Sequence, residues 1–125
     1  MAPTQGPLAA AGQPLRSTLR RRDFLRVSKT GRRQSTRLFL VYGLQREDQG
    51  PIRLGITVTR KVGNAVRRNR IKRLVREWFR QRRESVKGLD LVIIAKREFP
   101  SDTSQADVDA DLDEKLGRDC SRLLP

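Results

Sequence analysis

A strongly basic amphipathic stretch, KVGNAVRRNRIKRLVREWF from Lys61 to Phe79, constrains the fold more than any other part of the sequence. An α-helix turns by about 100° per residue, and at that spacing one side of the stretch carries only apolar residues. These are Ile71, Leu74, Val75, Trp78 and Phe79. The pattern predicts a helix from about Ala65 to Arg83 that packs its apolar side on a sheet.

The opposite side of this predicted helix is almost purely cationic. It carries Asn69, Arg73, Arg76 and Arg80, with Arg70 and Lys72 on its flanks. A helix side that meets only water normally mixes both signs of charge, because like charges one turn apart repel each other. Here Arg73 and Arg76 find only Glu77 nearby. An anionic partner is therefore favoured over a solvated surface.

Phosphate is the anion that suits this segment best. Arginine outnumbers lysine on the cationic side, and a planar guanidinium can give a phosphate two parallel hydrogen bonds. Gly63 and Asn64 stand at the start of the predicted helix, where free backbone N–H groups and the helix dipole also attract anions. A strand end, a glycine turn, a helix N-terminus and an arginine cluster together predict contact with a phosphate backbone.

Composition agrees with a nucleic-acid partner. The 125 residues include 28 Lys and Arg against 14 Asp and Glu, with no His, for a net charge of +14. Half of the acids lie between Asp102 and Asp119, so the positive charge is concentrated in the first part of the chain. Such a field attracts any polyanion. No apolar run approaches the ~20 residues that span a bilayer, so we expect no membrane partner.

The other predicted elements surround the basic helix. Ser17–Gly31 reads as a short helix capped by Ser17 or Thr18, with Gly31 in the place where a left-handed residue usually ends a helix. Thr36–Leu44 is rich in β-formers and reads as a strand. Ile52–Arg60 alternates apolar and polar residues, as a half-buried strand does.

After the basic helix, a strand and a weaker helix are expected. Leu89–Ala95 is nearly all apolar and predicts a central strand covered on both faces. A final helix is indicated by Val108, Leu112 and Leu116, with Ser101, Asp102 or Thr103 available as its cap. The order is helix, two strands that can divide into three, helix, strand, helix. It predicts an α+β fold with helices against one sheet.

The length fits one domain, for which we predict residues 16–120. Residues 1–15 read as a flexible Ala/Pro/Gly tail without the features of a secretory signal, and 121–125 as a C-terminal tail. Cys120 is the only cysteine, which is typical of a reducing compartment. We therefore expect a cytoplasmic protein.

The sequence offers no set of catalytic or metal-ligating residues. Without His there is no imidazole base, and one Cys cannot build a thiolate zinc site. Asp107, Asp109 and Asp111 are spaced like the start of a calcium loop, but Leu112 stands where glycine is needed and Arg118 where the closing glutamate should be. We predict no catalytic residue, no metal site and no cofactor in the chain itself.

Five ordered stretches resemble the protein subunit of bacterial ribonuclease P. The core of the match is TRKVGNAVRRNRIKRLVREWFR with its Arg-Asn-Arg at Arg68, Asn69 and Arg70, and the others are RRDFLRV, RLFLVYGL, RLGITVTRKVGNAV and DLVIIAKR. A lone Arg-Asn-Arg would carry no weight in so basic a chain. The ordered set, over about residues 19–97, is highly specific.

The resemblance implies a fold and a role. The implied fold is a two-layer α+β sandwich with a central mixed sheet in the order α-β-β-β-α-β-α. Its βαβ crossover is left-handed, as in the second domain of ribosomal protein S5 and against the usual rule. The implied role is to assist a catalytic RNA that removes the 5′ leader of precursor tRNA. The RNA would do the chemistry with Mg²⁺, the protein alone would be inactive, and no other protein would be obligatory.

The resemblance also assigns two RNA-binding surfaces. The surface for the catalytic RNA would consist of Arg60, Lys61, Asn64, Arg67, Arg68, Asn69, Arg70, Lys72, Arg73 and Arg76. The second surface, a cleft between the first helix and the sheet, would hold the single-stranded leader through Phe24, Arg26, Ser28, Arg37, Phe39 and Tyr42. Aromatic faces stack on any base, which suits leaders of differing sequence.

Some of these assignments have competing interpretations. From the sequence alone, core packing is favoured for Phe39, whereas Phe24 and Tyr42 are balanced between core and cleft. Ser28 replaces the second aromatic of many relatives, and the acidic last helix also departs from the family. The family's function has two alternatives: a ribosomal or assembly RNA-binding protein, and a DNA-binding module that places the basic helix in a major groove.

Overall fold

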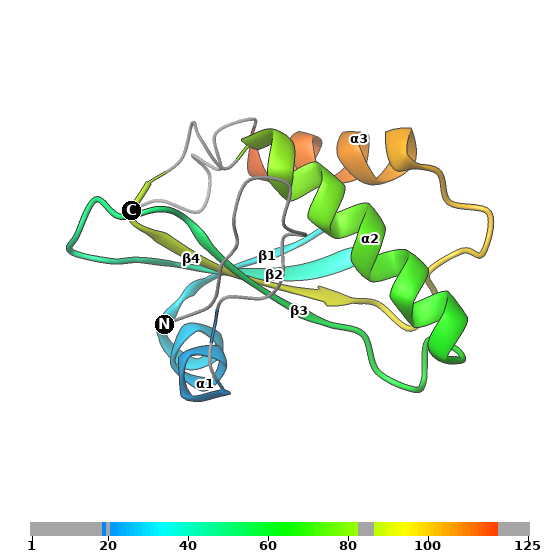
Figure 1. Cartoon of the computed structure of the whole chain (residues 1–125), viewed down its shortest axis with the longest axis horizontal. Coiled ribbons are helices and arrows are strands. Elements are labelled where there is room, and N and C mark those ends of the chain that lie inside the picture. Colours follow the sequence, from blue (N-terminus) through cyan, green and yellow to red (C-terminus); the bar gives the residue numbers. More distant parts are fainter. Residues whose placement is uncertain (1–18, 20, 83–86, 118–125) are drawn as a thin grey trace, which may run out of the picture.

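The computed structural model describes Leu19 and residues 21–82 and 87–117, which form three helices and four strands (Figure 1). In chain order these are α1 (Arg21–Thr30), β1 (Arg32–Ser35), β2 (Phe39–Gln45), β3 (Arg53–Thr57), α2 (Ala65–Arg82), β4 (Leu89–Ala95) and α3 (Gln105–Leu116). The predicted order of elements is confirmed. The predicted tails at 1–15 and 121–125, the caps Ser17 and Thr18, and Cys120 lie outside the described residues.

The four strands form one mixed sheet in the order β1-β2-β4-β3. β1 pairs antiparallel with β2, β2 pairs antiparallel with β4, and β4 pairs parallel with β3. The apolar run Leu89–Ala95 is therefore a central strand, as predicted, and six of its seven residues are buried. β2 pairs with β4 from Leu89 to Ala95, and β3 pairs with it from Asp90 to Ile94.

The sequence did not separate β1 from β2. We expected one strand over Thr36–Leu44, but the chain turns there and β1 precedes it. Thr36 closes the turn: its N–H donates to the Phe39 carbonyl (2.8 Å), and its Oγ1 accepts from the Phe39 N–H (2.8 Å). β1 itself reads RRQS and is mostly exposed, so it has no apolar alternation to reveal it.

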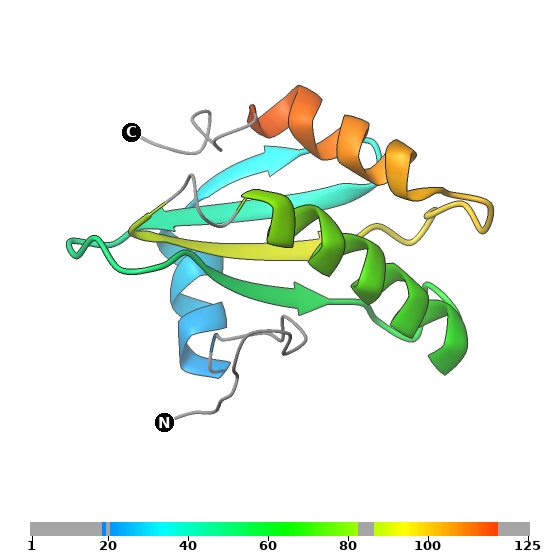
Figure 2. The same cartoon turned by 45° about the horizontal axis from the view of Figure 1, so that its top comes forward.

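Helices lie on both faces of the sheet. α2 and α3 lie side by side on one face and α1 lies on the other (Figures 1 and 2). In Figure 2, β3 and β4 both run to the right, β4 lies above β3, and α2 crosses in front of them. The β3–α2–β4 connection is therefore left-handed, against the usual rule for parallel strands.

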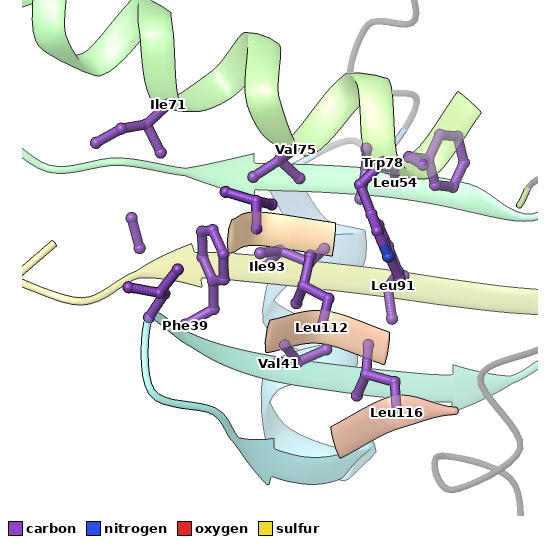
Figure 3. Close-up of a cluster of buried hydrophobic side chains, with 14 of the residues drawn as sticks. Phe39, Val41, Leu54, Ile71, Val75, Trp78, Leu91, Ile93, Leu112 and Leu116 are labelled. Atoms are coloured by element: carbon purple, nitrogen blue, oxygen red, sulfur yellow. The ribbon is translucent and has the colours of Figure 1, made fainter. Parts of the chain in front are cut away.

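The main core lies between the sheet and the α2/α3 layer. The predicted apolar side of α2 is confirmed, since Ile71, Val75, Trp78 and Phe79 are all buried there. Figure 3 shows Ile71, Val75 and Trp78 over Leu54, Leu91 and Ile93 of the sheet, with Leu112 and Leu116 from α3 closing the cluster. A smaller cluster on the other face contains Leu19, Val27 and Val92 under α1.

Two helix ends differ from expectation. Gly31 follows α1, but it does not have the left-handed backbone that we expected. Glycine is needed there for another reason: a Cβ would lie 2.8 Å from the Gly43 carbonyl oxygen of β2, on which the end of α1 rests. α3 is capped by Ser104, not by Ser101, Asp102 or Thr103. The Ser104 and Asp107 side chains each accept a backbone N–H from the other residue.

Candidate nucleic-acid interface

The loop before α2 presents two cations and then caps the helix. Val58 and Val62 are buried and anchor this loop, which leaves Arg60 and Lys61 exposed between them. Asn64 Oδ1 accepts the Arg67 N–H at 2.9 Å, so Asn64 is the N-cap of α2. We expected free N–H groups at this helix start; one of them is instead occupied by the cap.

The outer side of α2 carries cations without internal partners. Burial of Ile71 and Val75 turns Asn69 and Arg73 outward. Lys72 lies on the flank of the helix and Arg68 in its first turn, at the edge of the apolar side, and both side chains are half-exposed. The side chains of Arg60, Lys61, Arg68, Lys72 and Arg73 make no hydrogen bond or ion pair within the described ranges 21–82 and 87–117. No acid lies in the first turn of α2. This side is therefore available to an external polyanion.

Arg67 and Arg70 have internal partners, which the sequence did not indicate. Arg67 Nη2 donates to the Phe99 carbonyl and Arg70 Nη2 to the Thr103 carbonyl. The two arginines are three positions apart and share the side of α2 that faces the β4–α3 connection. Both were assigned to the catalytic RNA by resemblance; the structure shows that each first holds a loop on its own chain.

This difference predicts opposite stability effects for two neighbouring arginines. Arg70→Ala should lower the free energy of unfolding by about 1 kcal/mol, because it leaves the Thr103 carbonyl without this donor. Arg73→Ala should change it by less than about 0.5 kcal/mol, because Arg73 is exposed. Urea unfolding of the free protein measures both, and equal losses in the two variants would contradict the assignment.

Among the remaining charges of α2, Glu77 forms an ion pair with Arg80. Glu77 accepts hydrogen bonds from Arg80 and from Gln81, and the Arg80 hydrogen bond lowers the pKa of the Glu77 carboxyl. Arg80 is therefore partly neutralised. Arg76, which was also assigned to the catalytic RNA, is half-buried.

A second surface lies beside α1 on the other face of the sheet; we call Phe24, Tyr42, Leu44 and Ile94 the α1 surface. These four side chains are only partly buried and pack around Val27 and Val92. Phe24 lies directly over β3, where a Cβ on Gly55 would overlap the far end of its ring. Gly55 and Tyr42 both pair with Val92, so the two aromatic residues share one row across the sheet.

Three residues predicted for this surface lie elsewhere. Phe39 is fully buried on the opposite face, where its ring packs edge-on against Phe99 at 5.4 Å, so its assignment to the leader cleft is wrong. Arg37 lies at the β1–β2 turn, where its N–H donates to Asp111 of α3. Arg26 reaches the Asp90 carboxylate (3.1 Å), 100° around α1 from the buried Val27 and away from Phe24.

Ser28 is exposed on the Phe24 side of α1. Among the described residues, the α1 surface has two aromatic side chains, Phe24 and Tyr42, and both are only partly buried.

Asp90 is the centre of an ion-pair network that sequence reasoning missed. Its side chain is fully buried and accepts from Arg53 Nε and Nη2 (both 2.7 Å), from Arg46 Nη1 (2.8 Å) and from Arg26 Nη2 (3.1 Å). Burial alone would raise the pKa of the Asp90 carboxyl, but the hydrogen bonds and charges of Arg53 and Arg46 outweigh it and lower the pKa. The sequence did contain a sign of this network: Asp90 is an acid inside an apolar central strand, and a buried acid requires cationic partners.

The acidic residues of α3 serve the fold. Asp107 completes the cap, Asp111 binds the β1–β2 turn, and Asp113 accepts the Trp78 indole N–H at 3.0 Å. Among the described residues, no group of three or more His, Cys, Asp or Glu could hold a metal ion. The described helices also include none that is long and apolar enough to cross a membrane.

Comparisons with known proteins agree with this geometry. The sequence model of a family described as Ribonuclease P matches residues 15–118. The ribonuclease P protein component of Oleidesulfovibrio alaskensis is 47% identical over 87 residues, which cover 68% of this chain and 69% of that protein. Its counterpart in Staphylococcus epidermidis is 37% identical over 97 residues, which cover 78% of this chain and 84% of that protein.

Solved structures show the same fold. The RNase P protein of Staphylococcus aureus superposes with a TM-score of 0.72 at 31% identity, over 86% of this chain and 95% of that chain. The RNase P protein from Thermotoga maritima does so with a TM-score of 0.68 at 38% identity, over 78% and 92%. Sequence, fold and residue pattern agree, and the chain belongs to the family of ribonuclease P protein components.

Proposed function

We propose that this chain binds the catalytic RNA of ribonuclease P through α2 and the 5′ leader of precursor tRNA through the α1 surface. One observation carries the proposal: two surfaces of different chemistry lie on opposite faces of one sheet. The α2 side offers cations without internal partners, and the α1 side offers two half-buried aromatic rings beside a helix. A protein that joins two RNAs needs two such surfaces.

Each surface suits its RNA for a physical reason. Guanidinium groups form forked hydrogen bonds to phosphates and therefore favour a structured RNA backbone at Arg68 and Arg73. Stacking on Phe24 and Tyr42 needs no particular base and favours a single strand. In this proposal the RNA subunit, with Mg²⁺, cleaves the precursor in the cytoplasm, and the protein offsets repulsion between the two RNAs.

Reconstitution tests this proposal directly. A 5′-extended precursor tRNA is incubated at low Mg²⁺ with a bacterial ribonuclease P RNA, with this protein, or with both. We expect cleavage at the mature 5′ end only in the combined reaction, and a lower Mg²⁺ requirement than for RNA alone. Failure to stimulate a cognate RNA would favour a ribosomal or DNA partner, and cleavage by the protein alone would place an active site in the chain.

Gly55→Ala offers a specific test of the α1 surface. The added methyl group would occupy the place of the Phe24 ring end, so the ring must move off the sheet. We expect the affinity of the holoenzyme for a precursor with a long leader to fall by roughly fivefold, which is within the range of one lost stacking contact. Affinity for the catalytic RNA should not change, because α2 lies on the other face.

Two further variants serve as controls for Gly55→Ala. Thr57→Ala changes the next residue on the same face of β3 and should bind the leader normally. In a Phe24→Ala background the Gly55→Ala change should have no further effect, because the ring that it displaces is gone. An equal loss in that background would mean that Gly55 acts through something other than Phe24.

A further inference from the structure

The resemblance places Arg26 among the residues that bind the leader, but the geometry points to another role. We infer that Arg26 and Asp90 are positioning residues, which hold α1 so that Phe24 lies over Gly55 where it can meet a nucleobase. This inference rests on the proposed leader-binding function and concerns how that surface is built. It extends to Arg53 and Arg46, which complete the network around Asp90.

α1 needs such a support because it is short and weakly anchored. It has ten residues, and a helix of that length is marginal without tertiary contacts. Val27 is the fully buried side chain of its described residues, while Leu25 is 56% exposed. Between α1 and the sheet, the described residues show one side-chain hydrogen bond, from Arg26 to Asp90.

The network around Asp90 is rigid enough to fix Arg26. Arg53 gives Asp90 two hydrogen bonds of 2.7 Å from the neighbouring position of β3. Arg46 is only 12% exposed and, besides Asp90, donates to Asp48 and to the carbonyl oxygens of Leu89 and Pro51. The buried carboxylate is thus held from β3 and from the β2–β3 connection before Arg26 reaches it.

The local charge argues against a phosphate site here. The three arginines face three carboxylates, because Asp48 pairs with Arg46 and Asp23 lies 3.5 Å from Arg26 Nη2 in addition to Asp90. The cluster is therefore balanced in charge, unlike the outer side of α2. Arg26 and Phe24 also leave α1 on different flanks, about 100° and 60° on either side of Val27. The network therefore supports α1 from the side that Phe24 does not occupy.

Asp90 and Phe24 are nevertheless close enough to be coupled. Asp90 pairs with Arg53, and the next position on the same face of each strand holds Val92 and Gly55. Two residues along a strand span about 7 Å. The Arg26 anchor and the Phe24 ring therefore contact adjacent rows of the sheet. A small rotation of α1 would lift the ring from Gly55.

Two substitutions of opposite charge distinguish positioning from phosphate contact. Arg26→Gln removes a positive charge and Asp90→Asn removes a negative one. If Arg26 bound a leader phosphate, Arg26→Gln would weaken binding and lower the salt slope, whereas Asp90→Asn would strengthen binding or leave it unchanged. If Arg26 and Asp90 instead position α1, both substitutions should weaken leader binding by roughly fivefold and leave the salt slope unchanged.

The measurement uses the holoenzyme, with precursors that carry either a long leader or a single leader nucleotide. Affinity over a salt series gives the leader-dependent binding, and hydrogen exchange of α1 amides in the free protein reports its attachment to the sheet. We expect faster exchange in α1 for both variants and no loss with the short leader. Arg97→Gln, which removes an exposed arginine from the connection between β4 and α3, is the matched charge control and should behave as the wild type.

A Phe24→Ala background separates failure of this inference from failure of the proposed function. There, Arg26→Gln should cost nothing further, because the ring to be positioned is absent. If Phe24→Ala itself leaves leader binding intact, the leader surface is wrong. If Phe24→Ala weakens binding but Arg26→Gln does not, or if Arg26→Gln lowers the salt slope by about one, the positioning role is overturned. Arg26 is 50% exposed, so its replacement should leave the protein folded even where Asp90→Asn does not.

Discussion

Replacing Arg68, Lys72 and Arg73 together by glutamine should weaken binding of the catalytic RNA by about two orders of magnitude near physiological salt. These side chains have no partner within the described residues, so the change removes charge without breaking an internal contact. Each phosphate contact releases counterions, and three lost contacts should reduce the slope of log affinity against log salt by about two. Titrations of labelled RNA over a salt series measure both quantities.

The control for this triple variant removes the same charge elsewhere. Lys29 lies in α1, Arg33 in β1 and Lys87 before β4, and all three are exposed. Replacing all three by glutamine should leave most of the affinity for the catalytic RNA, and most of its salt slope, unchanged. If both triple variants lose affinity equally, net charge alone would attract the RNA, and the specific role of α2 would be contradicted. Circular dichroism should show the same helix content in both proteins.

The parts of this fold that could be predicted are those with local periodicity. The apolar side of α2 repeats at helical spacing, and its buried members were all identified from the sequence. The run from Leu89 to Ala95 is too apolar for an edge strand, which correctly placed β4 at the centre. Both signals can be read from a short stretch of sequence, because each comes from residues of a single helix or strand.

The contacts that escaped prediction join side chains far apart in sequence. Asp90 meets Arg26, Arg46 and Arg53, and the closest of these is 37 positions away. Arg67 and Arg70 reach carbonyl groups 32 and 33 positions downstream. A charged side chain looks the same in sequence whether it binds RNA or a carbonyl of its own chain. Only the fold separates Arg70 from Arg73.

One error could have been avoided from the sequence itself. Phe39 and Tyr42 are three positions apart on one strand, and side chains alternate between faces along a strand. They must therefore point to opposite faces and cannot both line one cleft. The structure places Phe39 against Phe99 in the main core and Tyr42 beside α1. Two residues separated by an odd number of positions on one strand therefore cannot both line the same cleft, and their burial shows which of them lies in the core.

Asp111→Ala should destabilise the protein by about 3 kcal/mol, because one carboxylate serves three donors. Its Oδ2 accepts from Thr36 Oγ1 (2.7 Å) and from the Leu38 N–H (3.1 Å), and its Oδ1 accepts from the Arg37 N–H (3.1 Å). Asp111 is 8% exposed and Leu38 is 1% exposed, so water cannot readily replace the lost acceptor. A domain of this size has about 5–15 kcal/mol of stability, so the variant should be close to unfolding at 37 °C.

Urea unfolding followed by circular dichroism measures this loss, and a graded series identifies its cause. Asp111→Asn keeps one acceptor oxygen and should cost about half as much, and Thr36→Val should remove the hydroxyl donor to Asp111 together with the acceptor of the Phe39 N–H. Asp102→Ala is the control, since it removes an equal charge from an exposed position outside α3. Asp102→Ala and Asp111→Ala raise the net charge equally. If both lower the free energy of unfolding by the same amount, self-repulsion between the cations sets the stability, and the hydrogen bonds from the β1–β2 turn to Asp111 do not. A larger loss in Asp111→Ala alone would show that the acidic last helix holds the hairpin whose second strand carries Tyr42.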